Sequence, residues 1–291
     1  MRNLLVSFSG GETSAFMAQW IKNNLESKYD NVLYAFANTG LENNETLDFA
    51  NLCDKHFNLN LIWVETKVNM NHGIGSNYVI TNYENAKRNG EPFEEVISKY
   101  GISNMSQPHC TRELKQVPLN KLARDYFNSN QFDTAIGIRV DEIDRINDNY
   151  KSKNLIYPLA DPTMKPTSKQ VINLYWKNMP FRLNLKGYQG NCITCWKKGD
   201  KKLFQIYQEN NNAFDFMIRM EEKYGLVNAQ NNIPHVFFRN NRSALDMIKL
   251  AKDWNGKIYD DSKNYNYQID IFNVIDESGE SCEVFSNCGD K

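Results

Sequence analysis

A glycine-rich segment near the N-terminus has residue types that suit the binding of a phosphate group. It joins an apolar run, residues 4–8, to a helical pattern, and it reads Ser9-Gly10-Gly11-Glu12-Thr13-Ser14. Glycines let backbone N–H groups turn toward an anion without interference from a Cβ atom. The start of a helix adds unsatisfied N–H groups and a partial positive charge, and the hydroxyls of the segment and of Ser7 add donors. We therefore predict a phosphate-binding loop, with an ordinary Gly-Gly turn as the alternative.

A pair of cysteines with metal-ligand spacing, Cys192-x-x-Cys195, is the second group that could carry chemistry. The chain has six cysteines, and in a reducing compartment clustered cysteines indicate a metal or redox site rather than structural disulfides. One Cys-x-x-Cys supplies two soft ligands, whereas a closed tetrahedral site needs four. A dithiol redox pair is the alternative. Cys53 falls within a helical apolar stripe, and we expect it in the core.

Two arginines follow a predicted strand at a point where they could contact a ligand. Arg139 comes directly after the apolar residues 135–138, and Arg145 lies a little further on. In an open parallel sheet the carboxyl ends of the strands line the ligand crevice, and an arginine there can contact phosphate bidentately. Asp141 and Glu142 could hold these arginines or a magnesium ion, or they could be solvated loop acids.

The apolar pattern predicts the elements that position these residues. Helices and strands alternate at the start of the chain, which implies a parallel sheet with right-handed crossovers. Residues 66–110 are less regular and are expected to form a long excursion beside the site. The predicted strands are 4–8, 32–37, 59–64 and 134–138, and the predicted helices are 13–25, 45–57, 92–100, 113–127, 168–176, 201–224 (as two helices) and 243–254.

Composition excludes several classes of protein. The formal net charge of −1 argues against a strongly basic nucleic-acid binder. No apolar run approaches the roughly 18–20 residues of a membrane span, and the first residues lack a secretory signal pattern. We therefore expect a cytoplasmic protein with no membrane partner, and the sequence leaves a homo-oligomer open.

The motifs resemble those of the PP-loop superfamily, the group of ATP pyrophosphatases and phosphoadenylyl-sulfate reductases. Two better-known loops are absent: no lysine follows the glycines as in the Gly-x-x-x-x-Gly-Lys-Ser/Thr loop, and there is no Gly-x-Gly-x-x-Gly fingerprint. The superfamily loop reads Ser-Gly-Gly-x-Asp-Ser, and here Thr13 replaces the Asp. Further matches occur in family order at Asn38-Thr39-Gly40 with Glu45-Thr46, Cys110-Thr111-Arg112-Glu113-Leu114-Lys115 with Pro118-Leu119, Gly137-Ile138-Arg139-Val140-Asp141-Glu142 with Arg145, Tyr157-Pro158-Leu159-Ala160-Asp161, and Gly187-Tyr188 with Cys192-Ile193-Thr194-Cys195.

The resemblance implies a fold, a ligand and a reaction. It implies a Rossmann-like parallel sheet of the adenine nucleotide alpha hydrolase type over residues 1–200, with a helical extension and a cysteine-containing tail over 201–291. ATP or phosphoadenylyl sulfate would bind with Mg²⁺, its phosphates on the loop and on Gly137 and Arg139, and its nucleoside at Asn38, Thr39 and Gly40. The reaction expected is adenylylation of an acceptor, a nucleic acid or a small molecule, for sulfur transfer. Lys115, Arg139 and Arg145 would counter the developing negative charge.

The resemblance also places Cys110 with the later cysteine pair, as a third ligand of a zinc or iron–sulfur site. The fourth ligand could be Cys282, Cys288 or His109. Similar proteins include phage-type reductase-like proteins and the sulfur-insertion proteins of DNA phosphorothioation. Two alternatives stay open: a sulfonucleotide reductase whose tail thiol, Cys288, is the nucleophile, and a nucleotide-binding or sensor protein without turnover, which the replacement at Thr13 favours.

Overall fold

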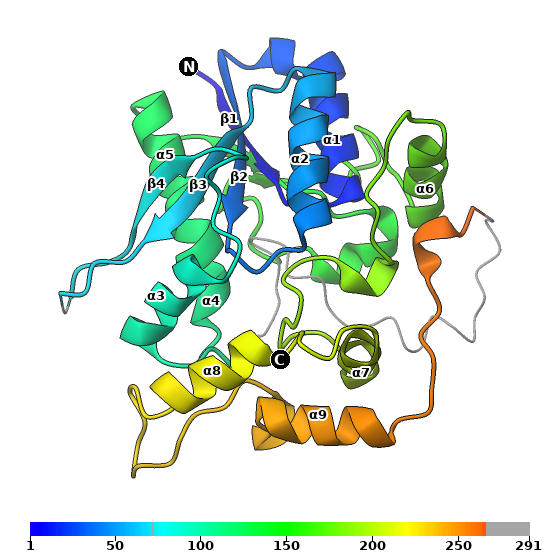
Figure 1. The fold of residues 1–291 in the computed structure, drawn as a ribbon. Coiled ribbons are helices and arrows are strands. Elements are labelled where there is room, and N and C mark those ends of the chain that lie inside the picture. The colour runs from blue at the N-terminus through cyan, green and yellow to red at the C-terminus, as the bar shows by residue number, and fades with distance from the viewer. Residues whose placement is uncertain (72, 266–291) are drawn as a thin grey trace.

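The computed structural model describes residues 1–71 and 73–265, and a six-stranded sheet lies at its centre (Figure 1). The strand order is β4-β3-β2-β1-β5-β6. Every neighbouring pair is parallel except β3 and β4, which are antiparallel. The prediction of an α/β protein with a largely parallel sheet is therefore confirmed. The strands are β1 (Asn3–Phe8), β2 (Asn31–Asn38), β3 (Ile62–Lys67), β4 (Asn77–Thr81), β5 (Asp133–Ala135) and β6 (Leu155–Ile156).

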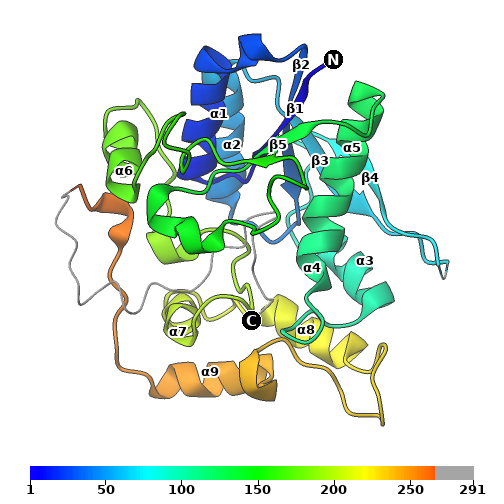
Figure 2. The same cartoon turned by 180° about the vertical axis from the view of Figure 1, so that it is seen from behind.

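Helices cover both faces of this sheet. The helices α1 (Glu12–Asn24) and α2 (Asn44–Phe57) lie on one face, and α5 (Val117–Phe127) lies on the other (Figures 1 and 2). A further helix, α6 (Lys169–Lys177), packs beside α1 in the same core. None of the helices in the described part of the chain is long and apolar enough to cross a membrane.

The side chains of β1 show why its sequence is apolar without interruption. Leu4 and Val6 join the core between the sheet and α1, whereas Leu5 joins the core between the sheet and α5. Successive side chains of a strand point to opposite faces, so a strand that is covered on both faces is apolar throughout. The apolar run that predicted this strand is thus a direct consequence of its central position.

A second hydrophobic cluster lies beyond the carboxyl ends of the strands, where further helices gather below the sheet in the view of Figure 1. Residues from both sides of position 200 share it. Phe93 comes from α3 (Glu91–Tyr100), and Trp196 comes from the loop that contains Cys192 and Cys195, which we call the cysteine loop. Met217 and Met247 come from α8 (Asp215–Tyr224) and α9 (Ala244–Asp253). The helical layer therefore closes over the edge of the sheet that carries the predicted site. Its helices are α3, α7 (Asp200–Glu209), α8 and α9.

Several boundaries differ from the predicted ones, and local backbone geometry explains them. The predicted strand 59–64 begins only at Ile62, because Asn58 and Asn60 adopt left-handed conformations (φ 52° and 55°) that a strand does not contain. The strand predicted to reach 138 ends at Ala135, because the chain turns where Ile138 N–H donates to the Ile136 carbonyl (3.0 Å). Strands β4 and β6 were not predicted.

The helix predicted over 113–127 begins earlier and has an irregular middle. It starts as α4 (His109–Thr111), continues as a π-helical segment, η2 (Arg112–Gln116), and then becomes α5. Such π segments occur often at functional sites. This one carries Lys115, which is buried.

Candidate functional site

The carboxyl edge of the sheet brings together the segments that the sequence singled out. Strand β1 lies between β2 and β5, and all three run in parallel. The residues that follow them, 9–14, 39–43 and 136–145, therefore leave the sheet on the same side. This is the edge at which open α/β sheets bind ligands.

The glycine loop turns sharply at Gly10, which packs against the neighbouring α2. Its φ is +81°, and a Cβ atom there would lie 2.5 Å from Thr46 Cγ2 and 3.2 Å from Phe36 Cε2. Both the backbone conformation and the close approach therefore require glycine. Gly11, by contrast, is the N-cap of α1 with an extended conformation (φ −98°) and has no such crowding.

The replacement Gly10→Ala is expected to lower the free energy of unfolding by about 2–4 kcal/mol, because it adds left-handed strain to a steric overlap. Denaturant unfolding of the full chain measures it. The matched control is Gly11→Ala, whose Cβ would meet nothing closer than Ser9 Oγ at 3.8 Å. Equal stability of the two variants would contradict this explanation of the turn.

Hydroxyl groups organise the inside of the loop. The amide and hydroxyl of Ser9 both donate to Ser14 Oγ (3.1 and 3.0 Å), and Ser14 donates to the Gly11 carbonyl (2.9 Å). Ser7, two residues before Ser9, is a buried residue of β1. Within the described residues no side chain caps the start of α1, so its first amides keep the anion-binding character expected of a helix start.

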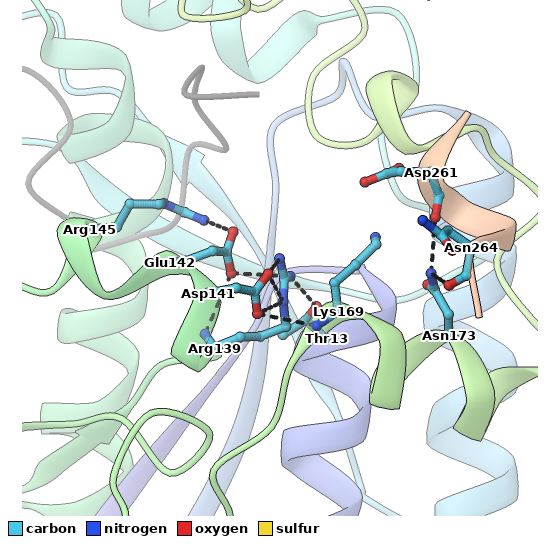
Figure 3. A network of polar contacts seen from close by, with 9 residues as sticks. All are labelled: Thr13, Arg139, Asp141, Glu142, Arg145, Lys169, Asn173, Asp261 and Asn264. Atoms are coloured by element: carbon cyan, nitrogen blue, oxygen red, sulfur yellow. Dashed lines mark hydrogen bonds and ion pairs between the residues drawn. The ribbon is translucent and has the colours of Figure 1, made fainter. Parts of the chain in front are cut away.

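Arg139 connects the loop to the segment after β5. Its Nη1 donates to Thr13 Oγ1 (3.0 Å), as Figure 3 shows. The two backbones also touch, since a Cβ on Gly137 would lie 3.2 Å from Ser14 Cα. The two segments that the sequence singled out therefore lie in direct contact at this edge of the sheet. Thr13, which replaces the carboxylate usual in the resembling loops, is the residue through which they meet.

Carboxylates hold the two arginines in place. Arg139 pairs with Asp141 (Nη2 to Oδ2, 2.9 Å) and with Glu142 (Nη1 to Oε2, 3.1 Å), and Arg145 also pairs with Glu142 (Figure 3). Burial raises the pKa of Asp141, but the Arg139 guanidinium outweighs it and the pKa lies below its ordinary value. Asp141 and Glu142 therefore hold the arginines, which is the first of the roles considered for them from the sequence.

Two residues near this network were not predicted. The backbone N–H of Lys169, the first residue of α6, donates to Asp141 Oδ1 (3.2 Å), and Figure 3 shows its side chain extending between Thr13 and Asp261. Arg182 forms an ion pair with Glu12 (3.0 Å). The run Pro166-Thr167-Ser168 before α6 is typical of a helix start, but it does not indicate a contact with this site.

The segment after β2 is tightly bound to its surroundings. Asn38 Nδ2 donates to Glu65 Oε1 (2.7 Å), and Thr39 donates to both oxygens of Glu42 (2.8 and 2.9 Å). Gly40 has a φ of +79° and packs against the backbone of Gly90. The residues expected to hold a nucleoside thus form a buried turn, in which the side chains of Asn38 and Thr39 already have hydrogen-bond partners.

The cysteine loop packs directly against that turn. Thr39 Oγ1 and Cys192 Sγ lie 3.4 Å apart, and Ile193 N–H donates to the Leu41 carbonyl (2.9 Å). Cys110 is buried in the same hydrophobic cluster that Cys192 contacts. The predicted core position of Cys53 is confirmed, since it is completely buried.

The metal site stays a prediction. Over residues 1–71 and 73–265, no three His, Cys, Asp or Glu side chains are grouped so that they could hold a metal ion. His109 Nε2 instead lies 2.9 Å from the Gly101 carbonyl oxygen, and burial lowers the pKa of its imidazole. Cys282 and Cys288, the other candidates for a fourth ligand, lie outside the described residues.

A buried lysine accompanies the cysteine loop. The Lys198 ammonium donates to the Ile193 carbonyl (2.9 Å), and burial lowers its pKa to about 8, although the neighbouring Cys195 and Cys192 oppose the shift. Between pH 8 and the ordinary lysine pKa, the unfolded chain binds more protons than the folded chain. Wild-type stability is therefore expected to rise with pH across that window.

The variant Lys198→Met is expected to raise the free energy of unfolding of the metal-free chain at pH 7 by about 2 kcal/mol, because it removes a desolvated charge. It should also abolish the rise in stability above pH 8. Urea unfolding at pH 7 and pH 9.5 measures both effects. A destabilised variant at pH 7 would contradict this view and would indicate that anionic thiolates compensate the ammonium.

Comparison with curated proteins finds a relative in a bacteriophage. The chain is 32% identical over 202 residues to a protein of Escherichia phage lambda described as "Uncharacterized nin region protein ORF290". The aligned part covers 68% of this chain and 67% of that protein. No protein-family model and no solved structure matches the chain.

Proposed function

Because this chain belongs to the same family as the uncharacterized nin region protein ORF290 of Escherichia phage lambda, the relative supplies no activity, and we propose a function from the chain's own residues. The protein is an adenine-nucleotide-binding enzyme of the PP-loop type, with a sheet of the adenine nucleotide alpha hydrolase type. It binds ATP, splits it between the α- and β-phosphates, and transfers the adenylyl group to an acceptor in preparation for sulfur transfer.

The observation that carries this proposal is the hydrogen bond between Arg139 and Thr13 (3.0 Å). It joins an arginine to the first turn of a helix that follows a strand and two glycines. Helix amides and a guanidinium beside one another form an electropositive cradle for a phosphate group. The contact also supports the order of motifs that resembles the PP-loop superfamily, because the resemblance expects these two segments to share the nucleotide phosphates.

The reaction would proceed mainly by positioning and charge neutralisation. An oxygen nucleophile of the acceptor attacks the α-phosphorus, the bond to the bridging oxygen breaks, and pyrophosphate leaves with that oxygen. The amides at the start of α1 hold the departing pyrophosphate, while Arg139, Arg145 and Lys115 counter its growing negative charge. A sulfur nucleophile would then displace AMP from the activated acceptor.

Pyrophosphate release is the direct test of this reaction. The full-length chain is incubated with ATP and candidate acceptors, a nucleic acid and small molecules, and released pyrophosphate is measured. We expect release from ATP without any sulfonucleotide. Consumption of an adenylyl sulfate in a thiol-dependent reaction, with no pyrophosphate from ATP, would instead establish a reductase. Tight nucleotide binding without product would establish a sensor.

A further inference from the structure

A carboxylate stands at the start of the helix that the proposed function uses to bind phosphate. Glu12 is the first residue of α1 and only 8% of its surface is exposed. An acidic residue in this position stabilises the helix itself through the helix dipole. For a bound polyphosphate, however, a nearby uncompensated carboxylate would be repulsive.

Arg182 compensates this carboxylate with two parallel hydrogen bonds. Its Nε donates to Glu12 Oε1 (3.0 Å) and its Nη2 donates to Glu12 Oε2 (3.1 Å). Burial raises the pKa of Glu12 above its ordinary value, and Arg182 opposes that shift. Trp176 Nε1 also donates to the Glu12 carbonyl (3.0 Å), which anchors the backbone at the same point. The bidentate pairing therefore fixes both the position and the charge of this carboxylate.

The same guanidinium also holds a distant part of the chain. Residues 260–265, which we call the strap, follow α9 along the chain and lie beside α6 (Figure 1). Arg182 Nη2 donates to the Ser262 carbonyl (2.8 Å) and Nη1 donates to the Tyr265 hydroxyl (3.2 Å). Asn173 of α6 adds hydrogen bonds to the carbonyls of Asp261 (3.0 Å) and Asn264 (2.7 Å), the latter two drawn in Figure 3.

We propose that Arg182 is a positioning residue that makes the start of α1 competent to bind a polyphosphate, and that docking of the strap sets it in place. The inference rests on the proposed function, since it concerns the same phosphate loop. Without Arg182, the Glu12 carboxylate would stand unneutralised beside the bound anion. Without the strap, the guanidinium would lose two of the groups that orient it toward Glu12.

Inorganic pyrophosphate is the probe, titrated into the full-length chain by calorimetry. Arg182→Leu is expected to weaken its binding roughly 10- to 100-fold, through repulsion by Glu12. Glu12→Gln alone should stay within about threefold of wild type, and the double variant Glu12→Gln/Arg182→Leu should return to the Glu12→Gln value, since it removes the repelling charge. Arg182→Gln also removes the charge and replaces the leucine variant if that variant fails to fold, with the same weakening expected.

Hydrogen exchange of the strap gives a second, independent readout. Since coupling between two sites is reciprocal, pyrophosphate should slow exchange in residues 260–265 of the wild-type chain, with the middle of α9 as the unaffected control. This protection should be lost in Arg182→Lys, which cannot bridge Glu12 and the strap with a planar fork.

The outcomes separate this inference from the proposed function. Absence of pyrophosphate and nucleotide binding by the wild-type chain would overturn both. Wild-type binding that Arg182→Leu leaves unchanged, or a double variant as weak as Arg182→Leu, would overturn the role of Arg182 alone and leave the proposed function standing. Binding without any change of exchange in the strap would overturn the part assigned to the strap.

Discussion

Replacement of Arg139 by leucine is expected to weaken the binding of ATP by at least about 100-fold, which corresponds to about 3 kcal/mol. The variant loses a guanidinium that is held beside Thr13 by two carboxylates. It also leaves Asp141 and Glu142 without that partner, and their negative charges then oppose a phosphate. The expected loss therefore exceeds that of a single charged hydrogen bond.

Calorimetric titration with ATP measures this effect, and two variants serve as controls. Arg124→Leu removes an exposed arginine from α5, on the far side of the sheet, and should leave ATP binding unchanged. Arg139→Lys retains a charge but not the planar fork, so we expect an intermediate loss. If Arg139→Leu binds ATP as tightly as Arg124→Leu does, the phosphate site lies elsewhere.

The second large effect is expected in stability, for Trp176→Ala in α6. This indole is 1% exposed and packs edge-on against Phe49, with ring centroids 4.9 Å apart. Its removal would leave a large cavity between α6 and α2 and would leave the Glu12 carbonyl without its indole donor. Large-to-small replacements of buried aromatic residues cost about 3–5 kcal/mol, and we expect a loss of unfolding free energy in that range.

Chemical denaturation at equilibrium measures the change, with Leu174→Ala as the matched control. Leu174 lies in the same helix but is 44% exposed, so its truncation should cost well under 1 kcal/mol. A similar small cost for Trp176→Ala would show that α6 is not anchored on the first helices as described.

Much of the fold and the meeting of two site segments could be predicted, for a simple geometric reason. Strands that are buried on both faces have uninterrupted apolar sequences, so β1 was recognisable without any partner. Parallel strands end at one edge, so a glycine loop after one strand and Arg139 after another were bound to approach each other. The contact between Arg139 and Thr13 follows from that arrangement.

Residues that reach the site from outside the sheet could not be predicted in this way. Arg182 lies in a loop after α6 and joins Glu12 to residues 260–265, and nothing in local periodicity indicates such a triple contact. Strand β4 escaped recognition because it is an antiparallel edge strand with exposed residues, among them Ile80 at 65% exposure. Its burial pattern therefore lacks the strict alternation or the continuous apolar run of an inner strand.

The role assigned to Glu12 shows how packing changes a prediction drawn from a motif. By sequence, Glu12 is one member of a phosphate loop and was grouped with the ligand-binding residues. In the structure its carboxylate is directed at Arg182, so we expect it to act on a bound anion through its charge and not through a hydrogen bond. Only the three-dimensional partner of a charged residue decides between these roles.

The proposed nucleotide site is tested by equilibrium titration of the full-length chain with ATP, followed by displacement with inorganic pyrophosphate. We expect saturable binding of one ATP per chain and competition by pyrophosphate, because both ligands would place phosphates at the start of α1 and at Arg139. If the chain bound none of ATP, an adenylyl sulfate and pyrophosphate at millimolar concentration, that result would contradict the proposed nucleotide site.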